Sequence, residues 1–241
     1  YLLQAFHGFF IKVDYDLFDP KRATLMDFSS DQSKGLNFMY LLPFSKTHAL
    51  VEPTFFLTHQ NFPNREQFLN LTKDYLEKNY HCSNFIIEKE ESGILPMRVN
   101  SINHDHNDKS EGVEKVASNA GLLRPSSGYG FYNIQRYIKA LVFDLKNNKI
   151  STHTTNKPII KHRKISLFLD NILICACRLY PEQAAEIFYQ VISKAPADCF
   201  VRFMQDQATL KDYFRIILAS PKKTLTKTAF VMLINKLKEI K

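Results

Sequence analysis

Hydrophobic and polar residues alternate over short distances in the first hundred residues, a pattern typical of β-strands. Aromatic and β-branched side chains dominate four such runs, at 6–13, 23–28, 36–43 and 47–56. Phe18-Asp19-Pro20 separates the first two runs, and Phe44-Ser45-Lys46 predicts a hairpin between the last two. The N-terminal part is therefore expected to form an antiparallel sheet.

Residues 64–80 follow a different period, because their apolar side chains recur at helical spacing. Asn64 is placed to cap this predicted helix, since its side chain can accept hydrogen bonds from the first free N–H groups. Strand character resumes at 82–89 and again at 94–97, with a turn predicted at Ser92-Gly93. The expected arrangement is a sheet with one covering helix.

The second half of the chain predicts helices. A polar surface loop at 100–115 and a short apolar segment at 116–123 precede a helix at 129–146, and a linker follows at 151–157. Five further helices are expected, several opened by proline, near 165–178, 181–194, 198–206, 209–219 and 224–239. The fold class is accordingly α+β, with domains at 1–99, 100–147 and 158–241.

The chain has a net charge of +8 and a pI of about 9.2, with its basic residues concentrated late in the sequence. Nucleic acid and an anionic membrane surface both attract such a chain, and a solvated basic face is the ordinary alternative. No zinc finger, recognition helix or RNA-binding aromatic motif is recognisable, so nucleic acid is not expected. No apolar run reaches the roughly 18–20 residues that span a bilayer, which leaves peripheral attachment.

Metal binding is not expected either. Cys175 and Cys177 lie in an apolar helical run, and no second cysteine pair completes a tetrahedral site. Buried, reduced thiols in a cytoplasmic protein are the simpler interpretation. The segment from His104 to Asp108 is rich in possible ligands but lies among turn formers, which favours a solvated loop.

Glu52 is the first candidate for chemistry. It lies between Leu50-Val51 and Phe55-Phe56, where poor solvation would raise its pKa and suit an acid that holds a proton near neutrality. Strand alternation equally allows Glu52 to point outward from a half-buried strand, and local chemistry alone favours that alternative.

A glycine-rich segment is the second candidate. Three of the chain's seven glycines, Gly121, Gly128 and Gly130, fall within ten residues. A helix starting near Gly128 would direct free N–H groups at an anion or at the pyrimidine edge of a reduced flavin. A helix-start turn without a ligand explains the same residues, and the segment is not a G-x-G-x-x-G fingerprint.

Five segments, in this order and spacing, resemble the lycopene cyclase family. They are FDPKRATLMDF at 18–28, FMYLLP at 38–43, ALVEPT at 49–54, GILPM at 93–97 and AGLLRPSSGY at 120–129. The resemblance covers about residues 4–145 well and the helical tail only loosely. It favours Glu52 as the catalytic carboxylate, because the matching hairpin in plant relatives carries an acidic residue required for cyclisation.

The resemblance implies a FAD/NAD(P)-binding fold of the p-hydroxybenzoate-hydroxylase type, in which a Rossmann-like domain is interleaved with an antiparallel substrate sheet. It implies cyclisation of the ψ end groups of lycopene to β-ionone rings, with reduced FAD as cofactor and NAD(P)H as reductant. Glu52 would be the acid or the cation stabiliser. The residues expected to approach the flavin are Gly121, Pro125, Ser126, Ser127, Gly128 and Tyr129.

Members of that family begin with a Gly-rich βαβ unit that binds the FAD pyrophosphate, and no such unit occurs in this sequence. The chain is therefore expected to lack an N-terminal nucleotide-binding segment. Two alternatives to a cyclase stay open: another flavoprotein of the same fold, such as a hydroxylase or isoprenoid reductase, and a non-catalytic polyene-binding protein.

Overall fold

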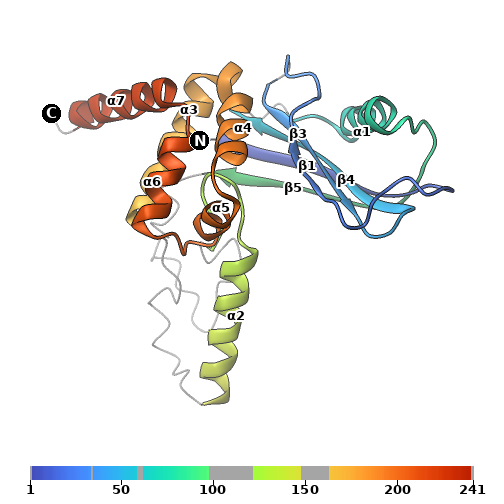
Figure 1. Ribbon diagram of the computed structural model, residues 1–241, viewed down its shortest axis with the longest axis horizontal. Coiled ribbons are helices and arrows are strands. Elements are labelled where there is room, and N and C mark those ends of the chain that lie inside the picture. Colours follow the sequence, from blue (N-terminus) through green and yellow to red (C-terminus); the bar gives the residue numbers. More distant parts are fainter. Residues whose placement is uncertain (1, 34, 59–61, 98–121, 148–162, 240–241) are drawn as a thin grey trace. The chain divides into compact units, whose positions relative to one another are not determined.

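The computed structural model describes residues 2–33, 35–58, 62–97, 122–147 and 163–239 (Figure 1). The chain forms two compact units. The sheet unit comprises Tyr1–Pro96 with the short segment Tyr180–Ala185, and the helical unit comprises Met97–Leu179 and Glu186–Lys241. The antiparallel sheet and the helices confirm the predicted α+β class.

The sheet unit contains one five-stranded sheet with the order β2-β3-β4-β1-β5. The strands are β1 (Leu2–Lys12), β2 (Thr24–Asp27), β3 (Asn37–Pro43), β4 (His48–Leu57) and β5 (Ile86–Met97). The pairs β2–β3, β3–β4 and β1–β4 are antiparallel, as predicted. The predicted hairpin joins β3 to β4, and its register places Tyr40 opposite Glu52.

Helix α1 (Arg65–Tyr80) packs on β4 and β1 (Figure 1). It begins where predicted, because Asn64 and Gln67 form a capping box: the Asn64 Oδ1 accepts from the Gln67 amide at 2.9 Å, and the Gln67 Oε1 accepts from the Asn64 amide at 2.8 Å. The core beneath it comes from alternate strand positions and from the helix: Ala5, Phe9, Ile11, Met39, Leu41, Ala49, Val51, Phe55, Leu57, Phe68, Tyr75 and Leu76.

The predicted turn at Ser92-Gly93 is wrong, since β5 runs without interruption from Ile86 to Met97. Gly93 serves a different purpose within the strand. A Cβ atom at this position would lie 2.7 Å from Cζ of Phe6, so glycine leaves room for the aromatic ring to lie against the backbone.

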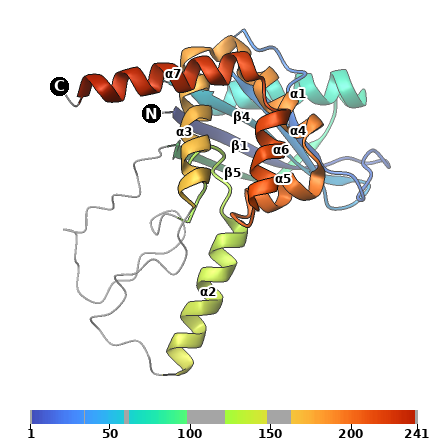
Figure 2. The same ribbon diagram turned by 60° about the vertical axis from the view of Figure 1, so that its left-hand side comes forward.

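The helical unit contains most of the helices predicted from the sequence. Their bounds are α2 (Phe131–Lys146), α3 (Lys164–Leu179), α4 (Ala184–Lys194), α5 (Ala197–Met204), α6 (Leu210–Ala219) and α7 (Lys222–Glu239). A short 3₁₀ helix, η3 (Pro181–Gln183), precedes α4 and belongs with the sheet unit, as do the first residues of α4. Helix α7 packs against α3, and α5 packs against α6 (Figures 1 and 2).

The cysteines agree with the sequence-based interpretation. All four are free thiols, three of them buried: Cys82, Cys177 and Cys199. Burial raises the pKa of Cys177 to about 12, so this thiol stays protonated and unreactive.

Several predictions lie outside the described residues. These are Gly121, the polar loop 100–115 with its His104–Asp108 segment, most of the apolar segment 116–123, and the linker 151–157. The chain divides into its two units between Pro96 and Met97, and residues 122–147 group with the later helices. The assignment of 100–147 as part of a FAD-binding domain stays a prediction. Within the described segments, no helix is both long enough and apolar enough to cross a bilayer.

Candidate functional site

Glu52 lies in β4 on the sheet face opposite α1, which is here called the Glu52 face. This follows from strand alternation, because its neighbours Val51 and Pro53 point toward the other side. Residues on the Glu52 face are Gln4, Phe6, Gly8 and Phe10 of β1, Phe38, Tyr40 and Leu42 of β3, Leu50, Glu52, Thr54 and Phe56 of β4, and Lys89, Glu91 and Gly93 of β5.

Aromatic side chains gather on the Glu52 face. Phe38 lies at the centre of an edge-to-face cluster, with ring centroids 5.4 Å from both Tyr40 and Phe56 and 5.7 Å from Phe28. Phe38 and Phe56 are buried, whereas Glu52 is half-buried. Tyr40, which lies opposite Glu52, belongs to this cluster, so the half-buried carboxyl has aromatic neighbours on one side.

Burial raises the pKa of Glu52 to about 7, and the negative charge of Glu91 acts in the same direction. The Thr54 hydroxyl, which donates to Oε1 of Glu52 at 3.4 Å, opposes this rise. Burial and the Glu52 charge also raise the pKa of Tyr40 to about 12, which keeps its phenol neutral. Glu52 can thus hold a proton near neutrality, as the sequence argument required.

The second predicted site forms a closed loop. The amide of Arg124 donates to the carbonyl of Tyr129 at 2.8 Å, and the amide of Gly128 donates to the carbonyl of Arg124 at 2.9 Å. Gly128 has φ of 67°, a left-handed conformation that glycine adopts without strain. Pro125 and Ser126 are buried in this loop, while Ser127 is half-buried.

The helix that follows this loop starts later than the sequence predicted. Helix α2 begins at Phe131 rather than near Gly128, because a residue with positive φ cannot belong to a right-handed helix. Gly130 occupies the N-cap and offers no side-chain acceptor to the first N–H groups. A Cβ atom at Gly130 would lie 2.2 Å from Cδ2 of Leu123, which accounts for glycine there.

These residues fit part of a flavin. The uncapped start of α2 provides N–H groups and the positive end of a helix dipole, which suit an electron-rich ring edge. Gly128 and Tyr129 remain half-buried beside it. Ser126 has another partner, because its hydroxyl donates to Oδ1 of Asp170 at 2.7 Å. The assignments of Pro125, Ser126, Ser127, Gly128 and Tyr129 to flavin binding stay predictions.

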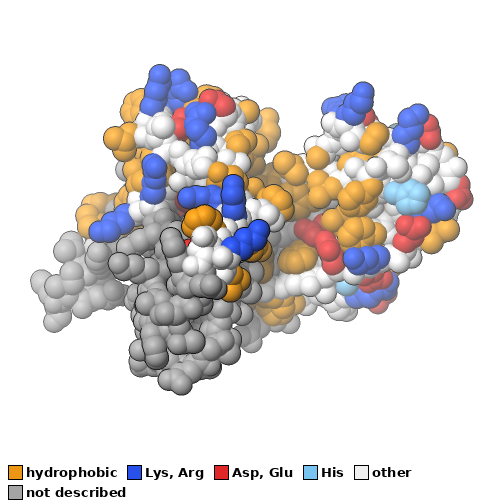
Figure 3. Space-filling model, turned by 90° about the horizontal axis from the view of Figure 1, so that it is seen from below, with side chains coloured by type: hydrophobic (Ala, Val, Ile, Leu, Met, Phe, Trp, Pro, Cys, Tyr) orange, Lys and Arg blue, Asp and Glu red, His pale blue; other side chains and the backbone are white. Residues whose placement is uncertain are grey.

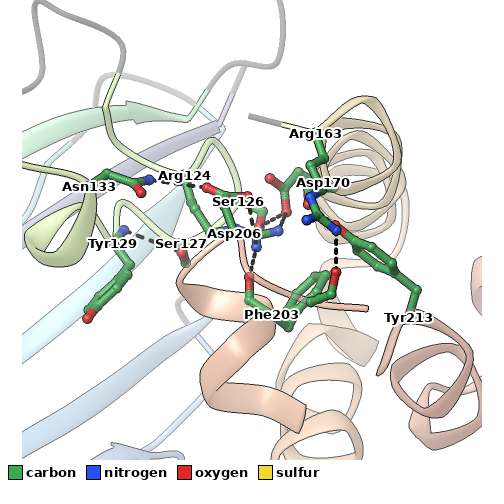
Figure 4. Close-up of polar contacts among 12 residues, drawn as sticks. Arg124, Ser126, Ser127, Tyr129, Asn133, Arg163, Asp170, Phe203, Asp206 and Tyr213 are labelled. Atoms are coloured by element: carbon green, nitrogen blue, oxygen red, sulfur yellow. Dashed lines mark hydrogen bonds and ion pairs between the residues drawn. The ribbon is translucent and has the colours of Figure 1, made fainter. Parts of the chain in front are cut away.

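A buried ion cluster anchors the loop within the helical unit (Figure 4). The Arg124 guanidinium donates to Oδ1 of Asp170 in α3 at 2.6 Å, donates to the Phe203 carbonyl in α5, and lies 4.1 Å from the centroid of the Phe203 ring. Its side chain is fully buried, and that of Asp170 is 2% exposed. Asp206 approaches the same guanidinium at 3.7 Å and accepts a hydrogen bond from Asn133 of α2. The cluster thus ties α2, α3 and α5 to the loop.

Sequence reasoning did not single out Arg124, Asp170 or Asp206. One signal was present: Asp170 is an acid inside the apolar run of α3, and a buried carboxylate requires a partner. The partner could not be read from spacing, because Arg124 lies 46 residues away. Tyr40 and Gly8 near Glu52 were likewise missed, and the sequence favoured a charged hairpin tip at Glu90-Glu91, beside the turn predicted at Ser92-Gly93.

Comparison with known proteins matches this chain to one family model, to a curated relative and to a solved structure. The family model described as "Lycopene cyclase protein" matches residues 1–230. The lycopene beta-cyclase of Pseudescherichia vulneris is 28% identical over 133 residues, which are 53% of this chain and 33% of that protein. A crystal structure of a geranylgeranyl bacteriochlorophyll reductase-like protein from Thermoplasma acidophilum aligns with 93% of this chain and 54% of its own, at 10% identity and a TM-score of 0.43. Because the family model spans nearly the whole sequence, the chain belongs to the lycopene cyclase family.

Proposed function

We propose that this chain acts in the redox-neutral cyclisation of lycopene ψ end groups to β-ionone rings. Membership of the lycopene cyclase family supports this proposal. The observation that carries it is the Glu52 carboxyl, with its pKa raised to about 7 on an aromatic sheet face. This carboxyl also lies in the segment that resembles the family's catalytic hairpin.

The cyclisation has three steps, which together require a proton donor, negative charge beside a cation and exclusion of water. A proton adds to the terminal double bond, an internal alkene attacks the resulting tertiary cation, and loss of a ring proton gives the product. Glu52 provides a proton when neutral and negative charge beside the cation when ionised. Tyr40, which lies opposite Glu52, would help to exclude water that traps the cation, and an aromatic ring face attracts positive charge.

Reduced FAD, with NAD(P)H as its reductant, would supply negative charge or a proton to the same reaction. The chain's own contribution is the start of α2, whose free N–H groups would hold the electron-rich edge of the ring. The Ser126 hydroxyl and the Arg124 guanidinium would fix the loop, because both donate hydrogen bonds to Asp170. For the fold, we propose a FAD/NAD(P)-binding arrangement of the p-hydroxybenzoate-hydroxylase type.

The proposal is tested by expressing the chain in a bacterial host that accumulates lycopene. We expect cyclised carotenoid, which chromatography and absorption spectra distinguish from lycopene. Unchanged lycopene together with flavin bound to the purified protein would instead favour a hydroxylase or reductase. Lycopene retained by purified protein without flavin would favour a non-catalytic polyene-binding protein. Either result would overturn the cyclase assignment for this chain.

Because lycopene resides in membranes, we also propose that the helical unit docks on an anionic lipid surface. Helix α6 exposes an apolar stripe of Leu210, Phe214, Ile217 and Leu218, at the spacing of one helical face. Lys211 on α6 and the exposed pair Lys222-Lys223 at the start of α7 add positive charge nearby. Figure 3 shows Lys and Arg side chains among hydrophobic ones on one face of the helical unit.

Flotation with liposomes that contain anionic lipid measures this docking. The wild-type chain is expected to float with the vesicles, and Phe214→Glu with Leu210→Glu should reduce the floated fraction several-fold. Leu25→Ser, a change at an exposed position of β2, serves as the matched control and should float like wild type. Equal flotation of all three proteins would contradict docking through α6.

A further inference from the structure

Gly8 is a glycine in the middle of β1, a position where glycine weakens a strand. Glycine is found there because any larger residue would crowd the neighbouring side chains. A Cβ atom at Gly8 would lie 2.8 Å from Cδ1 of Leu50, 3.1 Å from Cγ of Glu91 and 3.3 Å from Oε2 of Glu52. Side chains from β4 and β5 therefore converge above the bare backbone of the strand between them.

The two adjacent acids of β5 have opposite surroundings. Glu90 lies on the α1 side, where Oε2 is 2.8 Å from both Nε2 of His7 and Nε of Arg65. These hydrogen bonds hold the pKa of Glu90 at about 2. Glu91 lies on the Glu52 face and makes no ion pair within the described residues. Glu90 is therefore an ionised acid paired with cations, whereas Cγ of Glu91 lies beside Gly8, on the side where Oε2 of Glu52 also lies.

We propose that Glu91 is a positioning residue for Glu52, held against it by the clearance that Gly8 provides. Glu52 is half-buried and Glu91 is exposed, and a negative charge beside a poorly solvated carboxyl disfavours the ionised form of that carboxyl. Burial is the main reason that Glu52 favours its neutral form, and the charge of Glu91 adds to it, which supports the form needed to protonate an alkene. The catalytic part of this inference rests on the proposed function, whereas the coupling between the two carboxyls does not.

Other groups on this face do not replace Glu91 in that role. Tyr40 of β3 stands opposite Glu52, but its phenol stays neutral. Thr54 of β4 donates a hydrogen bond to Glu52, which favours the ionised form. Lys89 of β5 lies over the Phe10 ring, with Nζ 5.1 Å from the ring centroid. Glu91 is therefore the charged group that favours protonation of Glu52.

The coupling is tested by carbon-13 NMR titration of the full chain labelled at the glutamate carboxyl carbons, with the Glu52 signal assigned through Glu52→Gln. Glu91→Gln should lower the Glu52 titration midpoint by on the order of half a pH unit, because it removes the neighbouring charge. Glu88→Gln removes an equally exposed acid of β5 and should leave the midpoint unchanged. A Glu52 midpoint unaffected by Glu91→Gln would overturn the proposal.

Activity measurements separate this inference from the proposed function. If the protein cyclises lycopene, Glu91→Gln should shift the alkaline limb of the pH–rate profile to lower pH by the same amount as the Glu52 titration midpoint. Glu91→Asp keeps the negative charge and should restore part of that shift. A coupled titration in a chain that does not cyclise lycopene would refute the proposed function and leave the positioning role intact. If the protein is active and Glu91→Gln leaves its pH–rate profile unchanged, the positioning role is refuted and the proposed function is not. Far-ultraviolet circular dichroism verifies that each variant is folded.

Discussion

Glu52→Gln should abolish ring formation, with a loss of at least about 100-fold, because proton transfer by a positioned group typically contributes that much or more. Glutamine keeps the shape of the side chain and its contact with Thr54, but it neither donates a proton to an alkene nor carries a charge. The measurement is the ratio of cyclised carotenoid to lycopene in the expressing host. Glu88→Gln on β5 is the matched control and should keep wild-type activity. Normal cyclisation by Glu52→Gln would remove Glu52 from the mechanism.

The pH dependence of the wild-type reaction identifies which role Glu52 performs. Its pKa is raised to about 7, so the carboxyl is mostly neutral below that pH and mostly ionised above it. If Glu52 donates the proton, turnover falls as pH rises through about 7. If Glu52 stabilises the cation as a carboxylate, turnover rises over the same range. The two roles therefore predict profiles of opposite slope.

The sheet and its helix could be predicted because local signals agree with the tertiary structure. The apolar period at 64–80 and the Asn64 cap both predict α1. The helix starts at the predicted place because the capping box is formed by residues close to one another in the sequence. The prediction at Ser92-Gly93 failed for the opposite reason. Glycine was interpreted as a turn residue, whereas contact with the distant Phe6 ring explains its presence. A sequence pattern cannot separate these two uses of glycine.

The candidate site was predictable only in part. The segment around Glu52 indicated poor solvation, but the choice between an inward and an outward carboxyl required the resemblance to a family. The neighbours that shape its chemistry come from other strands: Tyr40 through the β3–β4 register, and Glu91 through the space above Gly8. Such contacts depend on strand order, which alternation within single strands does not specify.

The ion pair between Arg124 and Asp170 is expected to dominate the stability of the helical unit. Arg124→Met should destabilise it by about 3–5 kcal/mol, because it leaves the Asp170 carboxyl buried without its cation. It also removes the guanidinium from the Phe203 ring and carbonyl. Urea unfolding of the full chain at neutral pH measures the loss. Arg136→Met on α2 is the matched control, and its exposed side chain should change stability by no more than about 0.5 kcal/mol.

Removal of both partners should be far less harmful than removal of one. Nε of Arg124 and Oδ2 of Asp170 have no hydrogen-bond partner among the described residues, so the buried pair is incompletely satisfied. Replacing both charges with apolar groups of similar size removes two desolvation penalties together with the attraction. Arg124→Met with Asp170→Leu should therefore recover most of the stability lost by Arg124→Met alone. A double variant as unstable as the single one would assign the loss to packing around Arg124 rather than to an unpaired charge.

The loss of folding stability caused by Arg124→Met should also depend on pH in a defined direction. Burial raises the pKa of Asp170 even though Arg124 and Ser126 act to lower it, and removal of Arg124 lets that pKa rise further. A carboxyl whose pKa is higher in the folded than in the unfolded protein favours the folded state at low pH, and this contribution is lost as pH rises through the folded pKa. The difference in stability between wild type and Arg124→Met should consequently be smallest in acid and grow toward neutral pH. The buried carboxyl would titrate between about pH 4 and about pH 8. If the stability difference between wild type and Arg124→Met stays constant over this range, the ionisation of Asp170 does not cause the loss of stability.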